Sequence, residues 1–248
     1  MGFADDFHRF KVPTDMKQRS WPMICAWFLR FWIDLEDKID VQCSDSDGFE
    51  ILDLWCGSWW AIKDIILNVP LLTHGIIHGV DIHQYPQWKW IHPCNSDVRL
   101  VTWDAQNLVE HADNSKDFIY SMALLWYPRD VLRVIQEVYR LLKPSKSAYL
   151  YAMLWVKKLS NPPLDTIMIE LGIPFKIHGF TEEAHQQQQT GFYPEGCVLE
   201  IRKIWNPKNI TIPLIGTSPA ILNPSIHMDR AFESSLLISE YCLDAPTF

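Results

Sequence analysis

Eight consecutive residues, FEILDLWC (Phe49–Cys56), constrain the fold of this chain more than any other stretch. They form a short apolar run that is rich in β-forming residues and flanked by glycines, which is typical of a strand buried on both faces. Apolar residues at helical spacing follow from Trp60 to Asn68, Pro70 ends that helix, and a second apolar strand is predicted over Gly75–Ile82. A strand–helix–strand unit of about 30 residues predicts two parallel strands.

The same alternation continues along the chain. Strands are predicted at Asp97–Asp104, Lys116–Ala123 and Ser147–Trp155, and an amphipathic helix lies between the last two. Its apolar face comprises Val131, Leu132, Ile135, Val138, Leu141 and Leu142, whereas Arg129, Arg133, Gln136, Glu137 and Arg140 are expected to face water. Alternating strands and helices predict the α/β class, with a doubly wound, mainly parallel, Rossmann-like sheet of about seven strands.

The 248 residues are expected to form one domain with three parts. Residues 1–48 are predicted as an N-terminal helical extension with a Trp-rich helix over 21–38, and residues 49–155 as the core. Residues 156–248 are predicted to supply a lid, a β-hairpin and a C-terminal helix. The hairpin is placed at 197–215, at one edge of the sheet, and helices at 161–175, 181–192 and 225–242.

The charge and composition of the chain favour some classes of binding partner and disfavour others. A formal net charge of -8 gives no electrostatic footprint for nucleic acid. The N-terminus lacks the pattern of a signal peptide, and the apolar stretch Trp21–Ile33 is interrupted by Arg30. We therefore expect a buried helix in preference to an interfacial membrane helix, and no membrane partner. The 12 tryptophans suggest a bulky pocket or a surface for a protein partner or homodimer, with the Trp-rich helix as the candidate.

The cysteines are scattered without a CxxC pair, so neither a metal site nor a disulfide framework is predicted; they are Cys25, Cys43, Cys56, Cys94, Cys197 and Cys242. Reduced thiols fit a cytoplasmic location, with the nucleus as the alternative.

Three carboxylates stand at or near the ends of the first three predicted strands: Asp53, Asp81 and Asp104. In an open parallel sheet, ligands bind beyond the carboxyl ends of the strands, where the strand order reverses. A carboxylate at that place can accept hydrogen bonds from hydroxyl or amine groups of a ligand. The loops after these strands are therefore the candidate binding site.

Five segments follow one another in the order of a known pattern: ILDLWCGSWWAI, GVDIHQY, VTWDAQNL, NSKDFIYS and EVYRLLKP. Together they resemble the class I S-adenosylmethionine-dependent methyltransferases of type 11, over roughly residues 50–151. Within that superfamily, CGSWWAI, the QYPQW stretch and DAQN are most similar to the fungal LaeA-type methyltransferases and regulators of secondary metabolism. The resemblance implies a Rossmann-like methyltransferase fold and S-adenosyl-L-methionine as cofactor.

The resemblance also assigns residues to the cofactor. Asp53 and Gly57 would belong to the loop around its methionine end, and Asp81, with Ile82 beside it, to the ribose end. Asp104 would accept from the adenine amine.

Two further positions complete the implied cofactor site. Ala105 would supply a backbone amide beside the adenine, and Ser121 would lie near the transferred methyl group.

The first loop departs from the family pattern. Of three glycines only Gly57 remains, Trp55 and Trp59 stand near the other two, and the segment WAI arrives about one residue early. Glycines serve there because the backbone turns tightly and approaches the ligand closely. The two indoles either fill the space of the methionine moiety or point into the core and leave the site open.

Two other departures lie outside that loop. Lys116 replaces a Phe and would cost packing unless its stem reaches the surface. The segment KPSKS (Lys143–Ser147) replaces the usual KPGG, in a loop that is expected away from the cofactor and therefore neutral.

Candidates for an acid–base or acceptor role are weaker. His83, His92, His178 and His185 could include a general base, although an isolated histidine in a loop is more often structural. Trp126 and Tyr127, after the fourth strand, could line an acceptor pocket or be ordinary core aromatics.

These observations favour a methyltransferase that acts on a small molecule, in natural-product metabolism. The alternative is a methyltransferase-fold protein without methyl transfer: a partner subunit, a regulator, or a pocket reused for cofactor-free catalysis such as cyclisation. A Rossmann dehydrogenase is disfavoured, because GxGxxG is absent.

Overall fold

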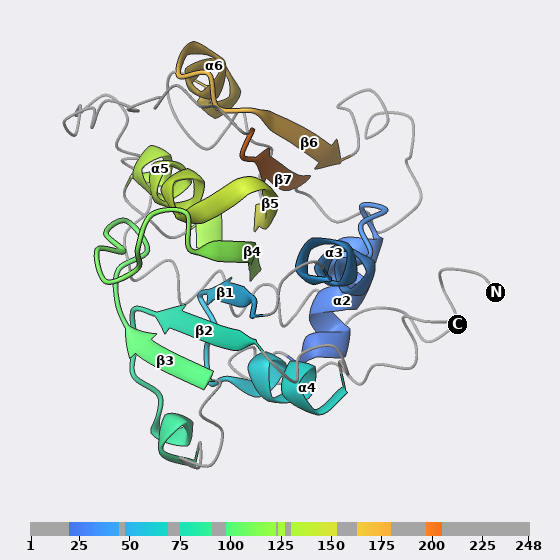
Figure 1. Cartoon of the computed structure of the whole chain (residues 1–248), viewed down its shortest axis with the longest axis vertical. Helices are drawn as coiled ribbons and strands as arrows, with labels where there is room; N and C mark the ends of the chain where they lie inside the picture. Colours follow the sequence, from blue (N-terminus) through green and yellow to red (C-terminus); the bar gives the residue numbers. More distant parts are fainter. Residues whose placement is uncertain are drawn as a thin grey trace, which may run out of the picture.

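Seven strands form one sheet in the order β3-β2-β1-β4-β5-β7-β6 (Figure 1). The computed structural model describes residues 20–44, 48–68, 75–90, 98–122, 124–126, 130–152, 163–179 and 197–204. The strands are β1 (Glu50–Leu54), β2 (Ile76–Asp81), β3 (Val98–Thr102), β4 (Lys116–Met122), β5 (Leu142–Ala152), β6 (Phe175–Gly179) and β7 (Cys197–Arg202). The helices are α2 (Trp21–Leu29), α3 (Leu35–Cys43), α4 (Trp60–Asn68), α5 (Val131–Leu141) and α6 (Leu164–Glu170), with short 3-10 helices η3 (Pro86–Trp90) and η4 (Leu124–Trp126).

The first five strands run parallel, and β7 and β6 are antiparallel to their neighbours. β1 pairs with β2 on one side and with β4 on the other, so the strand order reverses at β1. The predicted doubly wound, mainly parallel sheet of seven strands is confirmed.

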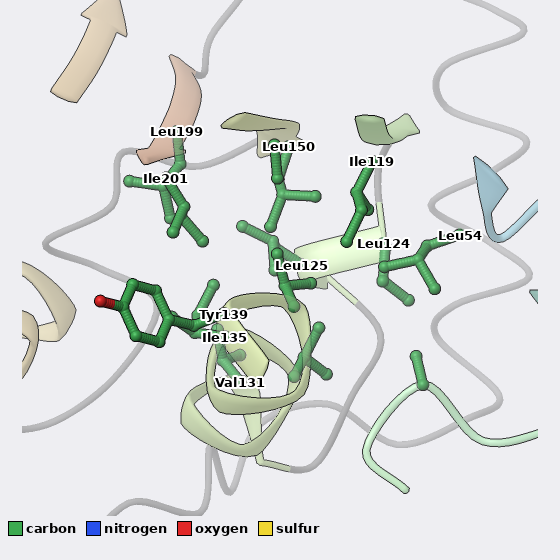
Figure 2. Packing of buried hydrophobic residues seen from close by; sticks show 14 of the residues in the cluster. Leu54, Ile119, Leu124, Leu125, Val131, Ile135, Tyr139, Leu150, Leu199 and Ile201 are labelled. Atoms are coloured by element: carbon green, nitrogen blue, oxygen red, sulfur yellow. The ribbon is translucent and has the colours of Figure 1, made fainter. Parts of the chain in front are cut away.

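One face of the sheet packs on α5 and α6. Leu54, Ile119, Leu150 and Leu199, from four different strands, point toward α5 (Figure 2). The apolar face of this helix is buried as its sequence pattern predicts, but the prediction that Gln136 and Glu137 face water is wrong. Both are under 8% exposed, and the carboxylate of Glu137 accepts a hydrogen bond from the amide of Leu108 at 3.0 Å.

The other face packs on α2, α3 and α4, and aromatic side chains dominate it. Residues of β4 and β5 alternate between the two faces, so that Phe118, Tyr120 and Tyr149 lie on this side. The helical extension before β1 thus covers part of the sheet, as Figure 1 shows.

The single helix predicted over 21–38 is in fact two helices. α2 ends at Leu29, Trp32 takes a left-handed φ of 60°, and Asp34 begins α3 by accepting from the amides of Glu36 and Asp37. The apolar spacing continues across this turn, which is why the pattern suggested one helix.

The predicted hairpin at one edge is corrected in part. β7 starts at Cys197 as expected, but it lies between β5 and β6, and the outer strand is β6. β6 was missed because it spans only 5 residues and because the helix predicted over 161–175 ends earlier, at Glu170. The rest of the hairpin and the helices expected at 181–192 and 225–242 fall outside the described residues.

The two departures outside the first loop also have structural outcomes. Lys116 does not reach the surface: it is 1% exposed and forms an ion pair with Glu50. The KPSKS segment is part of β5, where Ser145 has a φ of 67° and its amide bonds to the carbonyl of Lys203. A serine therefore adopts the backbone conformation for which glycine is usually selected.

Candidate functional site

The loops after β1, β2 and β3 all lie at the carboxyl ends of the parallel strands. Register places Leu54 beside Val80, and Val80 beside Val101, so these parallel strands end at the same level. Because the strand order reverses at β1, a ligand is expected to bind beyond these carboxyl ends.

The backbone after β1 turns as a glycine-rich loop would. Trp55, Gly57 and Trp59 have φ angles of 73°, 61° and 78°, all in the left-handed region. The amides of Trp55 and Cys56 both bond to the carbonyl of Val80, at 2.7 and 3.1 Å. Non-glycine residues pay roughly 1–2 kcal/mol each for this conformation, so the loop keeps its path in spite of its side chains.

The two indoles have identifiable packing partners. Trp55 is half-buried against the core cluster that contains Leu54 and Leu108. Trp59 stacks on Trp60, with ring centroids 6.2 Å apart and an interplanar angle of 19°, and the ammonium of Lys63 lies 5.9 Å from its ring. Both tryptophans therefore have contacts within the protein. Whether they also exclude the methionine moiety is decided by measuring the affinity of the protein for S-adenosylmethionine.

Asp81, at the end of β2, holds the loop after β1. Its Oδ2 accepts from the amide of Gly57 at 2.9 Å, and its Oδ1 accepts from the amide of His83 at 2.9 Å. The residue is 1% exposed. Each carboxylate oxygen can accept a second hydrogen bond, but a residue this buried can bind a ribose only after neighbouring groups move, such as the segment that follows β2.

That segment is fastened to the same loop. Trp88, in η3, donates its indole N–H to the carbonyl of Gly57 at 2.9 Å, and its ring lies 5.9 Å from that of Tyr85. Both polar groups of Gly57 are therefore bound by protein groups, its amide by Asp81 and its carbonyl by Trp88.

The remaining residues at the nucleoside end are more accessible. Ile82 is 37% exposed, an apolar side chain directly after Asp81. Asp104 is exposed, and both of its oxygens accept from the side-chain amide of Gln106, at 3.0 and 3.1 Å. Ala105 is buried in the core at 9% exposure.

Asp53 and Ser121 are buried and bonded between β1 and β4. Asp53, 3% exposed, accepts from the hydroxyl of Tyr120 at 2.8 Å. Ser121 is fully buried and donates to the carbonyl of Leu54 at 2.6 Å. The Ser121 hydroxyl thus links the two central strands, and its predicted position near the methyl group stays a prediction.

The candidate bases are dispersed. His83 is exposed beside Asp81, whereas Nε2 of His178 lies 2.7 Å from Glu200 on β7. Trp126 ends η4, and His92, His185 and Tyr127 fall outside the described residues. Tyr120 and Trp88 were not singled out from the sequence. Only their pairing with Asp53 and Gly57 in the fold gives them a place in the site.

A second polar cluster lies near the amino ends of the strands. Glu50 contacts Lys116 and, at 2.9 Å, His78, whose ring lies 5.0 Å from that of His111. Burial, followed by the charge of Lys116, lowers the pKa of His78 and of His111 to about 4. Burial also lowers the pKa of Lys116. This cluster lies outside the loops that form the candidate site.

The residues at the carboxyl ends of β1, β2 and β3 have the chemical types that S-adenosylmethionine requires. A cationic amino acid and a nucleoside need carboxylates, backbone amides and an apolar surface for a base. Asp53, Asp81 and Asp104 supply the carboxylates, and Ile82 supplies exposed apolar surface. Gly57 and Asp81 would hold the ligand only if their present partners make room.

Comparison with known proteins agrees with this arrangement. Residues 52–150 match a family model described as a methyltransferase domain. No curated protein matches the chain. The matched segment runs from β1 into β5, and the fungal LaeA-type subtype stays a prediction.

Two solved carbon methyltransferase structures share the fold at low identity. CurJ carbon methyltransferase has a TM-score of 0.54 at 12% identity, over 77% of this chain and 57% of that chain. DszA carbon methyltransferase has a TM-score of 0.53 at 14% identity, over 72% of this chain and 54% of that chain. A Methanococcus maripaludis protein, provisionally described as an S-adenosyl-L-methionine-dependent methyltransferase, has a TM-score of 0.47 at 17% identity, over 74% of this chain and 88% of that chain. The chain therefore spans little more than half the length of the two carbon methyltransferases.

No helix within the described ranges is long and apolar enough to cross a membrane. Within the described residues, Cys25, Cys43, Cys56 and Cys197 are not joined in disulfide bonds.

Proposed function

We propose that this chain, whose residues 52–150 match the methyltransferase domain, is an S-adenosylmethionine-dependent methyltransferase that acts on a small molecule in natural-product metabolism. The observation that carries the proposal is the backbone of the loop after β1. Left-handed φ angles at Trp55, Gly57 and Trp59 keep the turn that brings a backbone close to a ligand, although two of the three residues are tryptophan.

The net charge bears on the choice of acceptor, and the chemistry of methyl transfer bears on the need for a base. The net charge of -8 disfavours a nucleic-acid acceptor. Methyl transfer from a sulfonium to a nucleophile depends mainly on in-line positioning, so the dispersion of the candidate histidines does not weigh against the reaction. We propose a cytoplasmic location, with the nucleus as the alternative.

Calorimetric titration with S-adenosylmethionine and S-adenosylhomocysteine tests the proposal. We expect dissociation constants of about 10 μM or lower, near -7 kcal/mol. The matched control is Asp104→Asn, which keeps the size of an exposed side chain but removes its charge, and which should weaken binding of both compounds. Absence of binding at millimolar concentration of either compound would overturn the proposal.

A second candidate is a methyltransferase-fold partner subunit or regulator, and one observation favours it. Trp32 is 89% exposed and has a left-handed backbone, between α2 and α3. Tryptophan is enriched among the residues that anchor protein interfaces, and backbone strain clusters at functional sites. Sedimentation analysis of the native protein and of Trp32→Ser tests this candidate: a dimer that the substitution dissociates supports it, whereas a monomer that binds S-adenosylmethionine tightly favours the enzyme.

A further inference from the structure

Asp53 and Tyr120 form a buried pair across the two central strands. They are direct register partners in the β1–β4 ladder, and the tyrosine hydroxyl donates to Oδ2 of Asp53 at 2.8 Å. Asp53 is 3% exposed and Tyr120 is fully buried. Burial, followed by the charge of Asp53, raises the pKa of Tyr120 well above its ordinary value, so the hydroxyl stays protonated and able to donate.

The N-terminal extension packs on this pair through Trp21. The Trp21 ring meets the Tyr120 ring edge-on, with centroids 5.4 Å apart. Trp21 is itself fixed at two points, because its amide donates to Asp64 of α4 at 3.1 Å and its indole N–H donates to Glu36 of α3 at 3.0 Å. Three helices therefore meet at Trp21, whose ring contacts the tyrosine that bonds to Asp53.

Packing alone does not explain a hydroxyl at this position. Phe118 lies two residues earlier on the same face of β4 and Met122 two residues later, and both are buried without any hydroxyl. The face accepts purely apolar side chains, so the Tyr120 hydroxyl is distinguished by its bond to the carboxylate. A hydrogen bond to a charged group is also stronger than one between neutral groups.

We propose that Tyr120 is a positioning residue for the cofactor site, which holds the Asp53 carboxylate one residue before the end of β1, and that Trp21 couples the N-terminal extension to it. This inference rests on the proposed function, because Asp53 gains a ligand role only if the loop binds S-adenosylmethionine. The N-terminal extension then helps to hold the loop after β1 in place, through the contacts of Trp21 with Tyr120 and of Tyr120 with Asp53.

Tyr120→Phe tests the proposal, with Tyr149→Phe as the matched control. Tyr149 is its register partner on β5 and is also buried, and its hydroxyl lies 3.5 Å from Glu200, outside the site. We expect Tyr120→Phe to weaken binding of S-adenosylhomocysteine about tenfold or more, and Tyr149→Phe to leave it within about twofold. In a double-mutant cycle, adding Tyr120→Phe to Asp53→Asn should cause little further loss.

Hydrogen exchange gives a second readout that needs no ligand. The amides of Trp55, Cys56 and Gly57 are all bonded, and they should exchange faster in Tyr120→Phe than in Tyr149→Phe. Trp21→Phe, which keeps an aromatic ring but loses the bond to Glu36, should shift exchange in the same direction by less. Affinity and exchange both unchanged in Tyr120→Phe would overturn the proposal. Should the native protein bind neither compound, the proposed function fails, and the exchange data alone decide whether Tyr120 positions the loop.

Discussion

The amide nitrogen of Gly57 lies 2.9 Å from Oδ2 of Asp81 and donates a hydrogen bond to it. The acid at the end of β2 thus holds the loop at the end of β1, from the adjacent strand of the sheet. Because Asp81 also accepts from the amide of His83, it fixes both segments that a nucleoside would have to contact. Its contribution to stability and its predicted contribution to ligand binding can be separated by experiment.

Replacing Asp81 by Ala should destabilise the protein as well as weaken binding. The change leaves the amides of Gly57 and His83 without the carboxylate that accepts from them, and Asp81 itself is 1% exposed. Unsatisfied donors and the loss of two charge-assisted bonds predict a fall of about 2–4 kcal/mol in the free energy of unfolding. Urea denaturation measures it, and Asp81→Asn, which keeps an acceptor oxygen, should lose less. A change below about 0.5 kcal/mol in Asp81→Ala would show that the carboxylate does not hold the loop.

Trp88→Phe should loosen the loop from the other side. The phenyl ring can keep the contact with Tyr85, but it cannot donate to the carbonyl of Gly57. We expect a loss of about 1 kcal/mol in unfolding free energy and faster exchange of the Gly57 amide. Lys89→Ala, at an exposed neighbour in the same 3-10 helix, is the control and should change neither. Equal exchange rates in the two variants would show that Trp88 does not restrain the loop.

The same variant addresses access to Asp81. If the indole of Trp88 holds the segment after β2 over the ribose site, Trp88→Phe should bind S-adenosylmethionine more tightly than the native protein does. Titration of both proteins measures the difference. Weaker binding by the variant would instead make Trp88 part of the bound site.

The sheet could be predicted from the sequence because buried parallel strands are short apolar runs that are easily recognised between helices. The ends of β1, β2 and β3 could also be predicted, because Asp53, Asp81 and Asp104 mark them. The bonds that close the site could not. Tyr120 meets Asp53 over 67 positions and Trp88 meets Gly57 over 31, and no local spacing encodes either contact.

Backbone conformation was the second feature that could not be predicted from the sequence. A tryptophan gives no sequence signal for a left-handed φ, so neither the turn at Trp32 nor the retained path at Trp55 and Trp59 could be read from residue type. For Lys116 the sequence left two outcomes open, a packing cost or a stem that reaches the surface. It did not indicate the buried ion pair, because the partner Glu50 lies 66 positions away.

Glycine substitutions in the loop after β1 should separate strain from packing. Glycine matches the φ of 78° at position 59, so Trp59→Gly should relieve about 1–2 kcal/mol of strain and lose a stacking contact of about 0.5–1.5 kcal/mol. The net change in unfolding free energy should be small. Trp55→Gly should cost more, because Trp55 also packs against the buried core. Thermal or urea denaturation ranks the two variants, and the reverse order would contradict the packing seen here.

Titration of the double variant Trp55→Gly, Trp59→Gly then decides between the two alternatives for the indoles. If they fill the space of the methionine moiety, the double variant should bind S-adenosylmethionine more tightly than the native protein. Equal affinity in two folded proteins would show that the indoles lie outside the bound ligand.

Stability should fall as the pH drops below neutrality, because of the polar cluster near the amino ends of the strands. The pKa of His78 is lowered from 6.5 to about 4 by burial and then by Lys116, and the pKa of His111 is lowered to about 4 by the same causes. Between these values the unfolded chain binds more protons than the folded one, so the free energy of unfolding rises with pH from about 4 to 6.5. Arg99 and, near His111, Arg140 reinforce this direction, whereas Glu50 opposes it.

The neutral His78 side chain therefore makes its full contribution to the free energy of unfolding above pH 6.5. That contribution is lost as the pH falls toward 4. For a side chain as buried as His78 we expect about 1–3 kcal/mol over that range, and less for the half-buried His111, where water screens the charge. Urea denaturation at several pH values between these limits measures the slope, which His78→Gln should flatten. His83→Gln, at an exposed position after β2, is the matched control and should keep the native slope. A native slope in His78→Gln would place the acid sensitivity elsewhere, because glutamine cannot take up the proton that burial excludes from His78.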